Sequence, residues 1–245
     1  MRPFPALLLV ALLSAIGCLP SKAAAAETVE LAIEDAWEPY ANADGTGMSN
    51  DLVRAAYRAV GIEVKLRVRP YARVLIEVRN GTVTGGLNVA REPSTAPDFL
   101  WGQELLFQAD AHYYHRSDRP LRAKSAAELK HGERIGVIRG YEYGEQLFRN
   151  DAISKEWVSR HAQNISKLLA GRLDAIIMFD KTANLLLARN GLGKRIIPAF
   201  PCESSLIYVA FSLRHPKAAY FAGKLDEGLR IIKANGVHAD ITAKY

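Results

Sequence analysis

Aromatic residues beside an expected turn are the first candidates for contact with a small molecule. Trp37 and Tyr40 follow residues 29–33, whose alternating apolar and polar side chains predict a strand. In such a loop an aromatic side chain can cover the apolar part of a solute while losing little conformational freedom. Both residues could instead fill the edge of a hydrophobic core, and the sequence leaves the two interpretations open.

Tyr141 lies in a second candidate segment, the glycine-bounded residues 140–144. This segment follows an expected strand, residues 134–138, and precedes an expected helix. The first N–H groups of a helix have no partner within it, so they favour a carboxylate or another anion. We therefore expect Tyr141 and its neighbours to contact the solute.

Other kinds of chemistry have little support in the sequence. His112 and His115 would point to opposite faces of an expected strand, so they are not expected to share a metal ion. Ser204 and Ser205 lack the glycine-flanked turn of a hydrolase nucleophile. Cys202 has no expected partner and is interpreted as a buried, small apolar residue. The sequence predicts no cofactor, no metal ion and no catalytic residue.

Two runs of alternating strands and helices must position the candidate residues. Such alternation predicts α/β lobes whose mostly parallel sheets receive ligands at the strand ends. Residues 111–115 and 206–211 look like extended segments that cross between the runs. Two crossings imply that one lobe is inserted into the other and that the connection acts as a two-strand hinge. The expected division is residues 1–26 as a signal peptide, 27–112 as the first part of lobe 1, 113–205 as lobe 2, and 206–245 as the return to lobe 1.

The N-terminal residues have the pattern of a secretory leader. Arg2 gives a positive start, residues 6–19 are uncharged and mainly apolar, and an alanine run ends at Ala26, after which we expect cleavage. A retained anchor and a lipid-attachment site at Cys18 are the alternatives. Ala15 makes Cys18 the less favoured choice, because such sites usually carry leucine at that position. The expected location is the periplasm.

The charge of the chain is modest. The formal charge is +6, and loss of Arg2 and Lys22 with the leader would lower it to +4. No clustered basic run accompanies this excess, so a nucleic-acid partner is not expected. A small positive charge could still attract an anionic solute over a distance.

Several short motifs occur in an order and spacing that resemble the bacterial extracellular solute-binding proteins of family 3, the polar amino-acid-binding type. The resemblance covers nearly all of the chain after the leader. It implies a two-lobed periplasmic-binding-protein fold. The motifs are Trp37-Glu38-Pro39-Tyr40, Pro70-Tyr71-Ala72-Arg73, Glu128-Leu129-Lys130, Arg134-Ile135-Gly136-Val137, Gly140-Tyr141, Gly171-Arg172-Leu173-Asp174-Ala175 and residues 236–245.

The resemblance also implies how a solute would be held. Amino-acid binders of this family hold the carboxylate with an arginine, because a guanidinium makes two parallel charge-assisted bonds. That arginine follows the third strand, where this chain has Thr95 or Ala96. Arg73 and Arg91 are the substitute candidates, and a solvated surface charge is the alternative for either.

Two further residues complete the expected site. Asp180 stands near the position at which the family places an acid for the ligand's ammonium group, shifted by one residue. Asn88 lies in the expected strand 85–90 and is a polar candidate.

Two functions follow from this interpretation. The first is a monomeric periplasmic solute-binding protein, not an enzyme, that clamps a small polar and carboxylated solute, such as an amino acid or a related organic acid. It would deliver that solute to a membrane permease of the ABC-transporter type. The alternative is a dehydratase of the prephenate or arogenate type on the same scaffold, with Glu38 or Glu142 as the acid.

Overall fold

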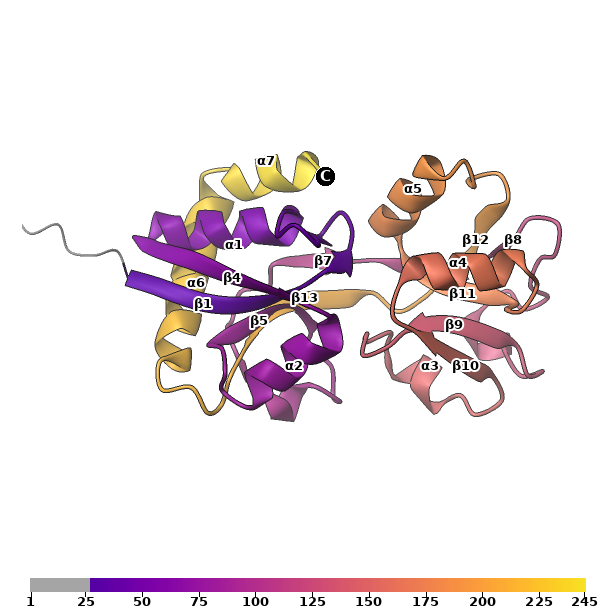
Figure 1. Ribbon diagram of the computed structural model, residues 1–245, viewed down its shortest axis with the longest axis horizontal. Coiled ribbons are helices and arrows are strands. Elements are labelled where there is room, and N and C mark those ends of the chain that lie inside the picture. The colour runs from indigo at the N-terminus through magenta and orange to yellow at the C-terminus, as the bar shows by residue number, and fades with distance from the viewer. Residues whose placement is uncertain (1–26) are drawn as a thin grey trace, which may run out of the picture.

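The computed structural model describes residues 27–245, which form two lobes side by side (Figure 1). The expected leader, the cleavage point after Ala26 and the alternative lipid site at Cys18 lie outside the described residues. Within residues 27–245, no helix combines the length and apolar character needed to cross a membrane.

The first lobe contains a mixed sheet with helices on both faces (Figure 1). Its parallel part pairs β1 with β4 on one side and with β5 on the other. The sheet order is β4 (Ile62–Arg69), β1 (Glu27–Glu34), β5 (Gly85–Ala90), β13 (Ser205–Phe211) and β6 (Leu100–Trp101), and β7 (Phe107–Ala109) pairs with β13. The helices of this lobe are α1 (Met48–Ala59), α2 (Tyr71–Arg79), α6 (Ala218–Ala234) and α7 (Val237–Ala243), with a 3-10 turn η1 (Ala96–Asp98) and a short ribbon of β2 (Ala36–Trp37) and β3 (Ala41–Asn42).

Helix α2 packs unusually close to the sheet because β5 carries glycine beneath it. A Cβ atom on Gly86 would lie 2.6 Å from Cγ1 of Val74 and 2.9 Å from Cγ2 of Val78. Real Cβ atoms do not approach other atoms this closely, so any larger residue at position 86 would push α2 away. The glycine therefore sets the height of α2 above the sheet, and with it the position of Tyr71 at the helix start.

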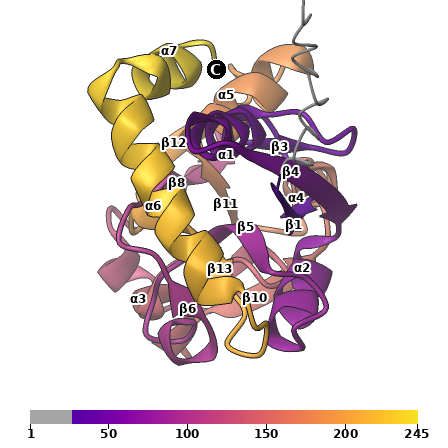
Figure 2. The ribbon, with the colours of Figure 1, turned by 90° about the vertical axis from the view of Figure 1, so that its left-hand side faces the viewer.

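Helices α1 and α6 pack against each other on one side of the first lobe, as the end-on view shows (Figure 2). The buried hydroxyl of Tyr57 donates a hydrogen bond of 2.9 Å to the carbonyl of Phe221. Helix α6 is the long C-terminal helix expected from the sequence, and it ends before Gly236, whose φ of +85° lies in the left-handed region. This helix closes the hydrophobic core of the first lobe.

The second lobe repeats the arrangement with a five-stranded mixed sheet. Parallel strands β9, β10 and β11 form one side, and the crossing strand β8 runs antiparallel to β11 and β12. The sheet order is β10 (Ser154–Val158), β9 (Arg134–Ile138), β11 (Ala175–Phe179), β8 (Ala111–Arg116) and β12 (Ile196–Pro201). Its helices are α3 (Glu145–Arg149), α4 (His161–Leu169) and α5 (Asp180–Arg189), with a 3-10 turn η2 (Ala126–Glu128).

The chain passes between the two sheets twice. It leaves the first sheet at Asp110, between β7 and β8, and returns through residues 202–204, between β12 and β13. The two crossings are tied together, since Cys202 donates its N–H to the carbonyl of Ala111 at 2.7 Å and Ser204 its hydroxyl to Asp110 at 2.6 Å. The predicted two-lobed α/β fold is confirmed. The sheets are mixed rather than mostly parallel, because the crossing strands run against the others.

Candidate functional site

A small cavity lies between the lobes, where the carboxyl ends of strands from both sheets meet. Its volume is about 10 Å³, roughly the space of one water molecule. Ligands of open α/β sheets bind outside these strand ends. The cavity is lined by Glu34, Trp37, Tyr71, Asn88, Ala90 and Ile207 of the first lobe and by Tyr141, Glu142 and Phe179 of the second.

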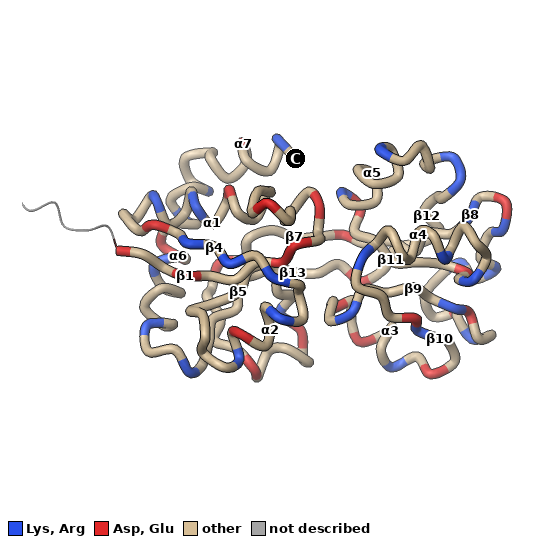
Figure 3. The backbone as a smooth tube through the Cα atoms, in the orientation of Figure 1, with Lys and Arg blue, Asp and Glu red and all other residues tan. Residues whose placement is uncertain are grey.

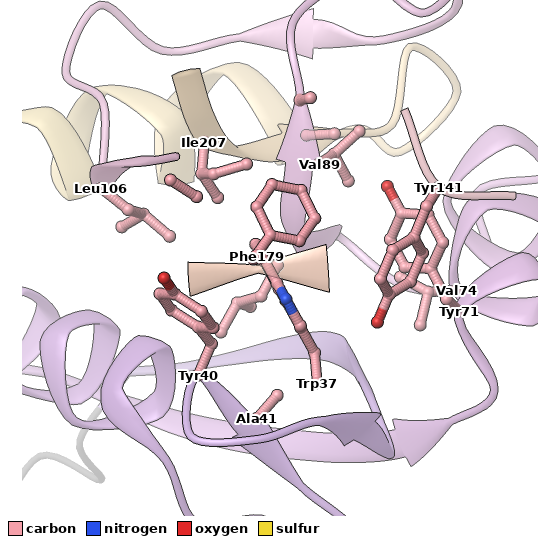
Figure 4. Packing of buried hydrophobic residues seen from close by; sticks show 14 of the residues in the cluster. Trp37, Tyr40, Ala41, Tyr71, Val74, Val89, Leu106, Tyr141, Phe179 and Ile207 are labelled. Carbon is pink, nitrogen blue, oxygen red and sulfur yellow. The ribbon is translucent and has the colours of Figure 1, made fainter. Parts of the chain in front are cut away.

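Aromatic rings from the two lobes meet around this cavity (Figure 4). The Trp37 ring centroid lies 4.7 Å from that of Phe179 and 5.9 Å from that of Tyr141. Tyr71 meets Tyr141 edge to face at 5.2 Å. Since Trp37 and Tyr71 belong to the first lobe and the other two rings to the second, the structure is a closed arrangement of the lobes.

Two tyrosine–glutamate hydrogen bonds cross the cavity in opposite directions. The hydroxyl of Tyr141, in the second lobe, donates to Glu34 at the end of β1. The hydroxyl of Tyr71, in the first lobe, reaches the two carboxyl oxygens of Glu142 at 3.0 Å and 2.8 Å. Each lobe thus contributes one acid and one tyrosine, and both bonds must break when the lobes separate.

Both cleft carboxyl groups are held in their neutral form by the closed structure. Burial raises the pKa of Glu34 from 4.5 to about 8, against a smaller opposing effect of the bond from Tyr141. Burial raises the pKa of Glu142 to about 8 as well, opposed by the bond from Tyr71. An isolated buried carboxylate is costly, so each acid retains its proton until a positive partner enters.

Several buried polar atoms at the cavity have no hydrogen-bond partner within the described chain. They are Oε1 of Glu34, Nε1 of Trp37 and both side-chain atoms of Asn88, although the Asn88 side chain is near enough to Glu34 to lower the pKa of that acid. Asn88 also has a φ of +67°, the one positive φ of a non-glycine residue in the part of the chain that the structure describes. Buried polar groups normally have partners, and strained residues gather at ligand sites. These atoms mark the cavity as a place where a polar ligand would supply the missing bonds.

Ion pairs join the lobes at the rim of the cleft. Arg160 of the second lobe lies 2.9 Å from Asp35, the residue after β1. Arg189 lies 2.7 Å from Glu38, whose backbone carbonyl also accepts a bond of 2.6 Å from Thr182. Acidic residues are therefore frequent where the first lobe faces the second, as the red segments at the end of β1 show (Figure 3).

The structure brings some of the residues expected from sequence to the cavity. Trp37, Asn88 and Tyr141 line it directly. Tyr40 lies behind Trp37, with ring centroids 4.3 Å apart, and stacks on Phe107 at 5.0 Å. Tyr40 therefore supports the position of Trp37 and is itself covered.

The three charged candidates lie elsewhere. The Arg73 side chain is 63% exposed and lies 3.7 Å from the carboxylate of Glu77 on the same helix. Arg91 is exposed, and its guanidinium covers the ring of Trp101 at 5.9 Å. Asp180 bonds to Nδ1 of His112 at 2.7 Å within the second lobe. Neither expected arginine lines the cavity, and neither does Asp180.

Several cavity residues were not among the sequence candidates, and the polar or aromatic ones among them are Glu34, Tyr71 and Phe179. Glu34 and Phe179 are the last residues of β1 and β11, so their position at strand ends was a usable signal. Tyr71 lies inside the motif that drew attention to Arg73. Glu142 is a sequence candidate only as the acid of the dehydratase alternative.

Comparison with known proteins gives matches at the level of structure. No protein-family model and no curated protein sequence matches the chain. The ArtJ protein from Geobacillus stearothermophilus, which binds arginine, lysine and histidine, is 22% identical with a TM-score of 0.72, over 89% of this chain and 95% of that one. An ancestral arginine-binding protein bound to arginine is 17% identical with a TM-score of 0.75, over 89% and 97%. The GluR0 ligand-binding core from Nostoc punctiforme, in complex with L-glutamate, is 18% identical with a TM-score of 0.74, over 89% and 98%.

These similarities show that the chain has the two-lobed fold of periplasmic solute-binding proteins. This is the fold that the resemblance of the sequence motifs implied. At this level of identity the similarities show the fold, so the function must be argued from the residues of the cleft.

Proposed function

We propose that the protein is a periplasmic solute-binding protein that closes its two lobes on a small polar solute. The observation that carries the proposal is the cavity between the lobes, with its two buried acids and its partnerless polar atoms. A solute that contacts both lobes favours the closed form by its differential affinity. Delivery of the solute by the monomer to a membrane permease belongs to the same proposal, which is supported by the fold shared with periplasmic binding proteins.

The group that this cleft recognises is an ammonium group. Glu34 and Glu142 line the cavity, and no Lys or Arg does. An ammonium group would restore the charge of the carboxylates, and the faces of Trp37 and Tyr141 would attract it further. This makes a solute with an amino group the better candidate than a simple organic acid. An amino acid meets the requirement if its carboxylate binds the N–H groups of Trp37 and Asn88.

A thermal-shift screen against amines, amino acids and organic acids tests the proposal. We expect amino-bearing compounds to raise the melting temperature and to make the protein more compact in small-angle scattering. Glu227→Gln changes an exposed acid of α6 that does not line the cavity. It is the matched control and should respond like the parent, whereas Glu34→Gln should lose the effect. A screen in which only organic acids stabilise the protein would contradict the recognition of an ammonium group.

The dehydratase alternative has its own test in the same samples. Incubation with prephenate should leave its concentration unchanged at catalytic amounts of protein. Consumption that disappears in Glu142→Gln would replace the binding function with an enzymatic one.

A further inference from the structure

The closed cavity is too small for a solute, but a much larger groove begins beside it. The groove has a volume of about 570 Å³ and shares Tyr141 and Glu142 with the cavity. Small-molecule sites span roughly 300–1,000 Å³, so the groove has the size of a binding site and the cavity has that of one polar group. The two spaces therefore meet at Glu142.

Apolar side chains from both lobes form the walls of the groove. Leu75 and Ile76 come from α2 of the first lobe, and Phe148 and Trp157 come from α3 and β10 of the second. Phe148 and Trp157 stack with centroids 5.9 Å apart and planes at 7°. Figure 1 places α2 and α3 on the same side of the two lobes.

Three of these four apolar side chains are exposed to solvent in the closed structure, and Leu75 is buried. Ile76 is 44% exposed, Trp157 38% and Phe148 36%. Large apolar side chains gathered in a groove with a polar rim are typical of a ligand site. The stacked pair of rings offers a flat surface on which another ring can lie.

The charges of the groove also select its occupant. Arg79 is paired with Asp98 at 2.9 Å, and Arg149 with Glu145, so the cations of the groove are already neutralised. Glu92 and Glu142 line the groove and have no ion pair among residues 27–245. Glu142 lies where the groove meets the cavity. The group that faces a ligand there is therefore an unpaired carboxyl, which becomes negatively charged when a cation binds beside it.

From this geometry we propose that the solute is an amine with an aromatic body, whose ammonium group lies at Glu142 and Glu34 and whose ring lies in the groove against Trp157 and Phe148. The inference rests on the proposed solute-binding function and specifies its ligand class. The ring contacts α2 of one lobe and the stacked pair of the other, so it adds to the contacts that hold the lobes closed. The solute needs no carboxylate, because the groove has no unpaired cation to receive one.

Three simple probes test the ring and the ammonium group separately. The first, 2-phenylethylamine, has both groups, and n-butylamine lacks the ring. The third, 3-phenylpropionate, has a carboxylate in place of the ammonium group. Calorimetric titration should show 2-phenylethylamine binding at least tenfold more tightly than n-butylamine. We expect 3-phenylpropionate not to bind.

Variants of exposed side chains then locate the ring. Trp157→Ala should weaken 2-phenylethylamine about five- to tenfold, because the loss of a stacked ring contact has that effect. It should leave n-butylamine unchanged. Leu213→Ala, another exposed apolar side chain outside the groove, is the control and should bind both amines like the parent. Both side chains are partly in solvent, so the folded state should tolerate either change.

Each contrary result has a distinct meaning. Equal affinities for the two amines, or an unchanged affinity of Trp157→Ala for 2-phenylethylamine, would overturn the placement of the ring. Tight binding of 3-phenylpropionate would overturn the role of the acids. If amino acids bind and neither amine does, the ligand class is wrong while the solute-binding function stands. If no compound binds or compacts the protein, both proposals fail.

Discussion

Closure of the ligand-free cleft should depend on pH, because the two buried acids bind protons more tightly when the lobes are closed. In the open form we expect Glu34 and Glu142 to return to their ordinary pKa of 4.5, whereas in the closed form the pKa of each is about 8. The closed form therefore holds more protons, so closure is most favourable below pH 4.5 and becomes less favourable as pH rises toward 8.

The size of the effect follows from these pKa values. Between pH 6.5 and pH 8, the free-energy cost of closing rises by about 3 kcal/mol for the two acids together. This corresponds to a change of roughly 150-fold in the ratio of closed to open protein. Burial lowers the pKa of His161 to about 4, so its contribution to the pH dependence of closure has the opposite sign. Its effect is small in this range, because a histidine with the ordinary pKa of 6.5 is already half neutral at pH 6.5.

Small-angle scattering of the ligand-free protein across this pH range measures the effect. The radius of gyration should increase from pH 6.5 to pH 8, whereas the Glu34→Gln/Glu142→Gln variant should show no such increase. The amide side chains can still accept the tyrosine hydrogen bonds but do not titrate. A pH-independent radius in the parent, or the same dependence in the double variant, would refute the assignment of these acids to the closed cleft.

Three further predictions concern individual side chains. Tyr71→Phe and Tyr141→Phe should each destabilise the closed form by about 1–3 kcal/mol, since each leaves a buried carboxyl oxygen without its donor. Weaker solute binding with an unchanged melting temperature would show this loss of closure. Arg73→Ala and Arg91→Ala should each change the free energy of solute binding by less than about 1 kcal/mol in calorimetry, because both side chains are exposed. A larger loss would identify that arginine as the residue that holds the solute. Burial raises the pKa of the Cys202 thiol to about 12, so the folded protein should react slowly with iodoacetamide at pH 8, and fast labelling would contradict the closed packing around it.

Much of the fold was predictable because it depends on local patterns. Residues 85–90 were expected as a strand and form β5, and the helix expected to end before Gly236 is α6. Hydrophobic periodicity and glycine stops act within one element, so a single sequence contains them. The direction of the crossing strands was not predictable in this way, since it depends on how the second lobe is inserted.

The site was predictable only in part, because its chemistry depends on contacts between distant segments. Trp37 and Tyr141 were expected from their loops, and both line the cavity. The bond between Tyr141 and Glu34 joins residues 107 positions apart, and nothing local in the sequence indicates it. Arg73 illustrates the opposite case: its place in a motif suggests a ligand contact, but its side chain is 63% exposed and does not line the cavity.

The central claim is that the two acids between the lobes hold the ammonium group of the solute, and one calorimetric comparison tests it most directly. The amine that gives the largest thermal shift should be titrated into the parent and into Glu142→Gln at pH 7.5. Loss of a buried, charge-assisted contact costs about 2–5 kcal/mol, so the variant should bind at least about 30-fold more weakly. An affinity within about twofold of the parent, in a variant that melts like the parent, would place the solute outside this cleft.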